Sequence, residues 1–214
     1  MQTFKFNEEY LSQIPALQLL GNLGYKILTP KDCLDLRGGD YGNVILDGVL
    51  RESLKKINKI NHKGKEFLFS ESNIQEATQK IKNVKFEGLL KTSEIIYDLL
   101  TLGESFEQVI EGSRLSPQLK YIDFENIENN DFHVVYEFKI EGINEIRPDI
   151  ILFVNGIPLA VIECKSPKIE IEEAVSQNIR NQGSEYCPKL FTYAQALLAI
   201  NKNASKYGTT GAES

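Results

Sequence analysis

The chain has 214 residues, of which 42% are hydrophobic and 25% are charged, and its net charge is −6. This balance is typical of a globular chain and excludes wholesale disorder. No apolar run approaches the roughly 18 residues that span a bilayer, and the N-terminus lacks the basic and apolar regions of a secretory signal. The negative charge argues against binding nucleic acid by charge alone, but it permits an enzyme whose acidic residues bind a divalent metal.

The rare residues exclude further classes of protein. The histidines are His62 and His133, and the cysteines are Cys33, Cys164 and Cys187. No CxxC or HExxH motif occurs, which argues against a structural zinc site and a zinc protease. No phosphate-binding GxxxxGK[ST] loop occurs either, so this chain alone is not expected to hydrolyse ATP. An odd, scattered set of cysteines predicts a reducing compartment, the cytoplasm.

The first half of the chain is predicted to be mainly helical. The expected elements are a helix over 7–23, a short strand within 24–30, a turn-rich loop over 35–43, and helices over 44–60, 70–82 and 88–100. Apolar residues at helical spacing carry these predictions. Pro15 is expected to kink or restart the first helix, and Ser70 is expected to cap the helix that follows it. The basic side of residues 51–65 fits either contact with DNA phosphates or an ordinary solvated face.

The second half is predicted to be rich in strands. Aromatic and β-branched residues favour strands over 120–127 and 132–140, and two apolar runs over 149–154 and 159–165 flank Asn155-Gly156, a strong hairpin signal. A helix is expected over 171–182, and a strand, or a strand leading into a helix, over 189–202. The tail from residue 207 carries no structural signal of its own.

Three charged residues interrupt the apolar hairpin. Glu163 and Lys165 are two residues apart, so they project from one face of their strand, and Cys164 projects from the other. A plain two-residue turn would place Asp149 on the face away from Glu163. An odd register, such as a turn with a bulge at Gly156, places both acids on one face, and the predicted site requires it.

Two carboxylates and a lysine around one point suit phosphodiester hydrolysis. Asp149 and Glu163 offer hard oxygen ligands for Mg²⁺, and the backbone carbonyl of Cys164 offers another. Lys165 is placed to position the attacking water or to stabilise charge on the phosphate. The same residues also fit a plainer interpretation, in which Glu163 and Lys165 form an ion pair at a strand end.

These residues resemble a known family. Arg147-Pro148-Asp149 followed by Glu163-x-Lys165 is similar to the PD-(D/E)xK nuclease pattern. The longer string, RPDIILFVNGIPLAVIECKSP with EEAVSQNIR and LFTYAQALLAIN, resembles the N-terminal nuclease domain of the restriction (R) subunit of type I restriction–modification enzymes. NEEYLSQIPALQLLGNLGY fits the first helix of that family. The resemblance is strongest over 133–210 and weak over 30–130.

The resemblance implies roles for the residues of the site. Asp149 and Glu163 become metal ligands, and Lys165 becomes the catalytic lysine. The family's Q-x-x-x-Y element matches at Gln177, with an asparagine, Asn181, at the tyrosine position.

Two accessory positions stay open. A second match to the same element exists at Gln182 and Tyr186. In related nucleases a glutamate of the first helix approaches the metal, and Glu8 or Glu9 is the corresponding candidate, although a helix-capping role fits equally.

The expected fold is an α/β restriction-endonuclease-like fold, a mixed central sheet with helices on both sides. One nuclease domain is expected over 1–214, with a helical subregion at about 44–103 and a catalytic core at about 117–205. The implied activity is Mg²⁺-dependent cleavage of double-stranded DNA, with Mn²⁺ able to substitute. The resemblance also implies a longer subunit with an ATP-driven DNA translocase, which alone needs ATP, and partner modification and specificity subunits, with no membrane association. The alternatives are a stand-alone nuclease and a non-catalytic DNA-binding or subunit-docking module.

Overall fold

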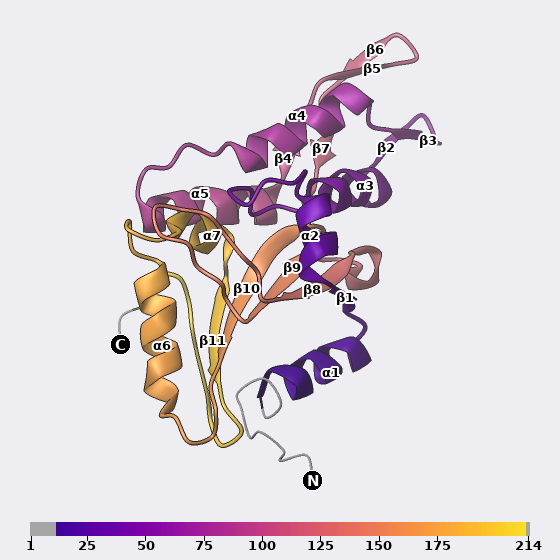
Figure 1. Cartoon of the computed structure of the whole chain (residues 1–214). Coiled ribbons are helices and arrows are strands. Elements are labelled where there is room, and N and C mark those ends of the chain that lie inside the picture. Colours follow the sequence, from indigo (N-terminus) through magenta and orange to yellow (C-terminus); the bar gives the residue numbers. More distant parts are fainter. Residues whose placement is uncertain (1–11, 213–214) are drawn as a thin grey trace.

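The centre of the molecule is a six-stranded mixed sheet, described by a computed structural model over residues 12–212 (Figure 1). Its strands, in spatial order, are β1 (Lys26–Leu28), β8 (Phe132–Tyr136), β9 (Ile150–Val154), β10 (Ile157–Cys164), β11 (Ala196–Ile200) and β12 (Ser205–Gly208). β1 is parallel to β8 and β10 is parallel to β11, whereas the other neighbouring strands are antiparallel. The predicted mixed α/β sheet is therefore confirmed.

Helices cover both faces of this sheet. They are α1 (Ile14–Asn22), α2 (Pro30–Leu36), α3 (Asp47–Ile57), α4 (Glu71–Lys82), α5 (Leu89–Leu102), α6 (Ile171–Asn181) and α7 (Pro188–Tyr193). Leu17 and Leu20 of α1 pack on the face that carries Ile150 and Ile162. α6 lies alongside β11 on the other side (Figure 1), and its residues pack against Ala199. None of the helices over residues 12–212 is long and apolar enough to cross a membrane.

Short two-stranded sheets complete the described part of the molecule. β2 (Lys59–His62) pairs with β3 (Lys65–Leu68), β4 (Glu104–Ser105) pairs with β7 (Gln118–Leu119), and β5 (Gln108–Ile110) pairs with β6 (Ser113–Leu115). A 3-10 turn, Ile127–Asn129, precedes β8. These short strands and α2 were not predicted from the sequence, because short strands and a seven-residue helix carry little hydrophobic periodicity.

Several helix predictions are confirmed. α4 starts at the expected Ser70, whose hydroxyl accepts a hydrogen bond from the Asn73 amide (3.2 Å). α5 and α6 lie within two residues of their predicted spans. α1 is described from Ile14, with Pro15 in its first turn, where the missing N–H loses no bond. Its expected start at residue 7 lies outside the described residues.

Two predictions in the second half are wrong. Residues 120–127 form an irregular loop in place of a strand, because Tyr121 is buried with its hydroxyl on the Ala77 carbonyl, and Asp123 and Asn130 bind the loop's backbone. Over 189–202 the order is helix α7 and then strand β11, because Pro188 begins a helix. The tail also has structure, since β12 pairs with β11 and ends at Gly208.

Candidate active site

The hairpin of β9 and β10 sets the position of the acids. Asn155 and Gly156 form a two-residue turn with φ of 51° and 80°, and Val154 pairs with Ile157 across it. The register then shifts between Pro158 and Ala160, so that β10 holds one extra residue, and Ile162 pairs with Ile150. Continuing this pairing by one residue brings the next two positions, 163 and 149, opposite each other on one face.

The odd register required by the sequence analysis is therefore confirmed, but the bulge is not at Gly156. The positive φ of Gly156 serves the turn itself. The extra residue is Leu159, next to Pro158, which lacks the N–H that a regular ladder would use. Cys164 projects from the opposite face, as predicted, and packs with Ile162 and Ile150.

The turn is fixed against the rest of the molecule. The Leu46 amide donates to the Gly156 carbonyl at 2.9 Å, and a Cβ added at Gly156 would lie 2.6 Å from the Leu46 oxygen. The buried Asn155 side chain donates to the Tyr121 carbonyl and accepts from the Asp131 amide. This network holds the hairpin, and with it the two acids, in one place.

Glu163 is fully buried, and both of its carboxylate oxygens contact α6. The Gln177 amide nitrogen donates to Oε2 at 2.7 Å, and the Asn181 amide nitrogen donates to Oε1 at 3.4 Å. Burial, and then the neighbouring Asp149 carboxylate, raise the pKa of Glu163 to about 9, although Lys165 and Gln177 oppose this shift. Metal-free Glu163 is thus expected to be protonated at neutral pH.

Asp149 and Lys165 complete the group. The Cys164 amide donates to Oδ2 of Asp149 at 2.6 Å, which fixes that carboxylate beside the end of β10. The Lys165 ammonium donates to the Gln177 side-chain oxygen at 2.9 Å. Gln177 therefore links Glu163 to Lys165, and the structure brings all four side chains together.

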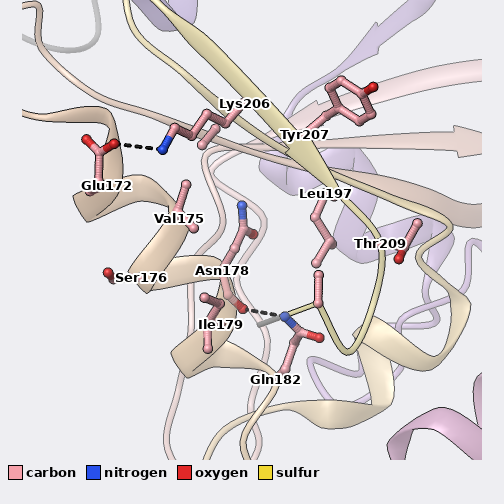
Figure 2. Close-up of a pocket in the computed structure, with 13 residues that line it drawn as sticks. Glu172, Val175, Ser176, Asn178, Ile179, Gln182, Leu197, Lys206, Tyr207 and Thr209 are labelled. Atoms are coloured by element: carbon pink, nitrogen blue, oxygen red, sulfur yellow. Dashed lines mark hydrogen bonds and ion pairs between the residues drawn. The ribbon is translucent and has the colours of Figure 1, made fainter. Parts of the chain in front are cut away.

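Gln182 does not join this group. Its amide nitrogen donates to the Asn178 carbonyl, and its oxygen accepts from the Gly211 amide. Gln182 and Asn178 line a cavity of about 360 Å³ that α6 shares with residues of β11 and β12. Figure 2 shows the two side chains on its wall. Of the two candidate glutamines, Gln177 is the one that the structure places beside the acids.

The start of α1 reaches the same end of the sheet. The Ser12 hydroxyl donates to the Lys165 carbonyl (2.7 Å), and the Gln13 amide donates to the Asp149 carbonyl (3.1 Å). No local motif marks these two contacts, so they could not be predicted from the sequence. Its candidates Glu8 and Glu9 lie outside the described residues.

The donor set suits a hard divalent cation. Two carboxylates face each other, and the Cys164 carbonyl points toward the Asp149 side, because a strand residue's N–H and C=O point the same way. Over residues 12–212, no group of three or more His, Cys, Asp or Glu side chains could hold a metal ion. Further ligands at this site from the described part of the chain would therefore be backbone carbonyls or neutral side-chain oxygens, alongside water. A buried acid beside a second acid is relieved by a cation, so these residues fit Mg²⁺.

The basic side chains that segment 51–65 contributes to α3 are paired with acids. Arg51 and Lys55 pair with Glu71, and Lys56 pairs with Asp131 at 3.0 Å. These contacts favour the solvated-face interpretation of this helix.

Comparison with known proteins places the chain in a family. The sequence matches the family described as "Type I restriction enzyme R protein N terminus" over residues 5–214. The chain belongs to this family. The family resemblance expected from the hairpin and its acids is thereby confirmed.

Individual relatives agree. The HindI endonuclease subunit of a type I restriction enzyme of Haemophilus influenzae is 30% identical over 97% of the chain and 19% of the relative. A Methanocaldococcus jannaschii protein, provisionally named the MjaIXP endonuclease subunit of a type I restriction enzyme, is 30% identical over 96% of the chain and 20% of the relative. The chain spans about a fifth of the length of these relatives.

Proposed function

We propose that this chain is the metal-dependent nuclease domain of a type I restriction enzyme and cleaves double-stranded DNA. The observation that carries the proposal is the fully buried Glu163 facing Asp149 at the end of an anchored hairpin. Burying an acid beside a second, half-buried acid is unfavourable even with the charge of Lys165 nearby, and folds keep such pairs mainly where a cation or a reaction uses them. Membership of the restriction-subunit family supports a nuclease role for the pair.

The residues of the site have distinct proposed roles. Asp149, Glu163 and the Cys164 carbonyl would hold Mg²⁺, and Mn²⁺ would take the same place. When bound, the metal polarises the scissile phosphate and lowers the pKa of a water ligand. The Lys165 ammonium stabilises negative charge that develops on the phosphate, and Gln177 holds that ammonium in line with Glu163.

The longer enzyme supplies the remaining functions in this proposal. The relatives named above are endonuclease subunits about five times the length of this chain. The rest of such a subunit would carry the ATP-driven translocase, and separate modification and specificity subunits would choose the DNA site. The cytoplasm, where the DNA substrate lies, is the proposed location.

Titration of the chain with Mn²⁺ and Mg²⁺ by calorimetry tests the metal site. The wild-type chain should bind, and Asp149→Ala should abolish binding. Asp98→Ala is the matched control, because it removes one acid from an exposed position of α5 and should bind normally. Metal binding should also raise the unfolding temperature of the wild-type chain.

The same titration separates the proposal from its alternative. Absence of metal binding in the wild-type chain, both alone and with duplex DNA, would overturn the nuclease proposal and favour a docking module. Binding that survives Asp149→Ala would place the metal elsewhere and would overturn the assignment of this site.

A further inference from the structure

α6 presents two amide side chains to one carboxylate. Gln177 and Asn181 are four residues apart, so they lie one above the other on the same face of the helix. Their amide nitrogens reach different oxygens of Glu163, Oε2 and Oε1 respectively. Asn181 is 1% exposed, so this amide has no bulk water to contact.

We propose that Asn181 is a positioning residue that fixes the rotation of the Glu163 carboxylate in the metal site. The inference rests on the proposed function, since it assigns Asn181 a role in holding a proposed ligand. Asn181 occupies the tyrosine position of the family's Q-x-x-x-Y element, where this chain departs from that element.

The orientation of the Asn181 amide follows from its neighbours. The Arg180 guanidinium donates to Oδ1 of Asn181 at 3.3 and 3.4 Å, and it lies over the Tyr186 ring, 5.4 Å from its centre. Arginine can only donate hydrogen bonds, so it selects the oxygen end of the amide. The nitrogen end is thereby turned toward Glu163, where a carboxylate needs a donor.

Two hydrogen-bond donors fix the rotation of the Glu163 carboxylate, whereas one donor does not. Metal binding requires ionised Glu163, which loses its hydrogen bond with Asp149. The terminal torsion of a glutamate side chain is soft, so an ionised carboxylate held by α6 only through Oε2 would pivot about the Gln177 contact. A second donor on Oε1 removes that freedom. Each carboxylate oxygen has about two acceptor sites, so one site per oxygen remains for a metal ion.

The Asn181 amide thus fixes Glu163, the proposed metal ligand, without adding charge to the site. Partners that orient a metal ligand typically contribute about 10–100-fold in metal affinity. The expected effect of losing Asn181 is therefore on metal affinity more than on the chemical step.

The test compares two buried asparagines of the same helix. Asn178, three residues before Asn181, is 4% exposed and donates to the Leu198 carbonyl, but it does not contact Glu163. Asn181→Ala should weaken Mn²⁺ binding by about tenfold in calorimetry. Asn178→Ala should lower the unfolding temperature to a similar extent and leave the Mn²⁺ affinity unchanged.

Asn181→Leu provides a second variant, because it keeps the branching at Cγ and fills the space while removing the donor. It should weaken Mn²⁺ binding as Asn181→Ala does. In plasmid cleavage by the full-length enzyme, both Asn181 variants should need more Mn²⁺ for half-maximal rate but approach the wild-type rate at saturating Mn²⁺. A role in folding alone would not produce this dependence on metal concentration.

The outcomes separate this inference from the proposed function. Wild-type Mn²⁺ affinity in either folded Asn181 variant would overturn the inference and leave the proposed function standing. Equal loss of affinity in Asn178→Ala would reduce Asn181 to a structural role. Failure of the wild-type chain to bind Mn²⁺, both alone and with duplex DNA, would overturn both.

Discussion

Asp149 faces Glu163 across the hairpin because β10 holds one residue more than β9 between the turn and the site. The extra residue, Leu159, sits between two pairs that are otherwise in register. Without it, position 163 would pair with position 148, and Glu163 would project from the face that α1 covers, away from Asp149. A single irregular residue thus decides whether the two carboxylates form a site.

The turn that starts this hairpin should be intolerant of any side chain at Gly156. Gly156→Ala adds a Cβ 2.6 Å from the Leu46 oxygen at a φ of 80°. Left-handed strain and overpacking each contribute at least about 1 kcal/mol, so the free energy of unfolding should fall by about 2–4 kcal/mol. Denaturant unfolding measures this change.

Gly64 provides the matched control for this prediction. It occupies the same position of the β2–β3 turn with a φ of 76°, but no atom lies within 4 Å of an added Cβ. Gly64→Ala should therefore lose only about 1 kcal/mol, from backbone strain. Equal losses in the two variants would show that the contact with Leu46 does not constrain the turn.

Local signals in the sequence predicted the parts of the site that depend on one element. Asn155-Gly156 marked the hairpin, the Glu163-x-Lys165 spacing marked one face of a strand, and the spacing over 171–182 marked α6. These patterns are short-range, and the hydrogen bonds of the strand and helix follow from them directly.

The remaining features depend on contacts between distant residues. The bulge at Leu159 requires knowing how Pro158 disturbs pairing with β9, and the contact of Asn181 with Glu163 requires the packing of α6 on β10. The contact between Ser12 and Lys165 spans 153 positions of the chain. The aromatic run at 120–127 suggested a strand, but Tyr121 is buried by tertiary packing without any ladder.

The stability of the metal-free chain should fall as pH rises. The pKa of Glu163 is raised to about 9 from an ordinary value of 4.5, so between these values the folded chain keeps a proton that the unfolded chain releases. The folded state binds more protons in this window, and stability therefore decreases with pH. Between about pH 5 and about pH 8, the unfolding temperature of the wild-type chain should fall more than that of Glu163→Gln.

Metal binding should release the proton that Glu163 keeps in the metal-free chain. Mg²⁺ or Mn²⁺ requires ionised Glu163, so binding near neutral pH should release about one proton. Calorimetry in buffers of different ionisation enthalpy measures this release. Parallel pH profiles for wild type and Glu163→Gln, with no proton release, would contradict the assignment of the raised pKa to Glu163.

Substitution of Gln177 and substitution of Gln182 should have different effects on metal binding and stability. Gln177→Ala removes a donor from Glu163 and the acceptor of Lys165, so Mn²⁺ affinity should fall by about 10–100-fold. Gln182→Ala removes the bond from the Gly211 amide and should lower the free energy of unfolding by about 1 kcal/mol, with unchanged Mn²⁺ affinity. Calorimetry and denaturant unfolding on both variants provide the comparison. Loss of metal binding in Gln182→Ala alone would move the accessory role to the second match.

Lys165 should affect cleavage far more than metal binding. Its ammonium contacts Gln177 and lies at the end of the strand that carries Glu163, where charge develops on a bound phosphate in the proposed reaction. Lys165→Met keeps most of the side chain's length but removes the charge. Loss of one group that stabilises such charge lowers turnover by about 10²–10³-fold, whereas Mn²⁺ affinity should change by no more than a few-fold. Single-turnover cleavage of a plasmid by the enzyme that contains this domain measures the turnover, and calorimetry measures the Mn²⁺ affinity.

Lys168→Met is the control for this prediction. It removes an exposed lysine three residues later and should leave both the turnover and the Mn²⁺ affinity unchanged. Wild-type turnover in Lys165→Met would show that this lysine belongs to the structural ion-pair interpretation and has no part in the chemistry.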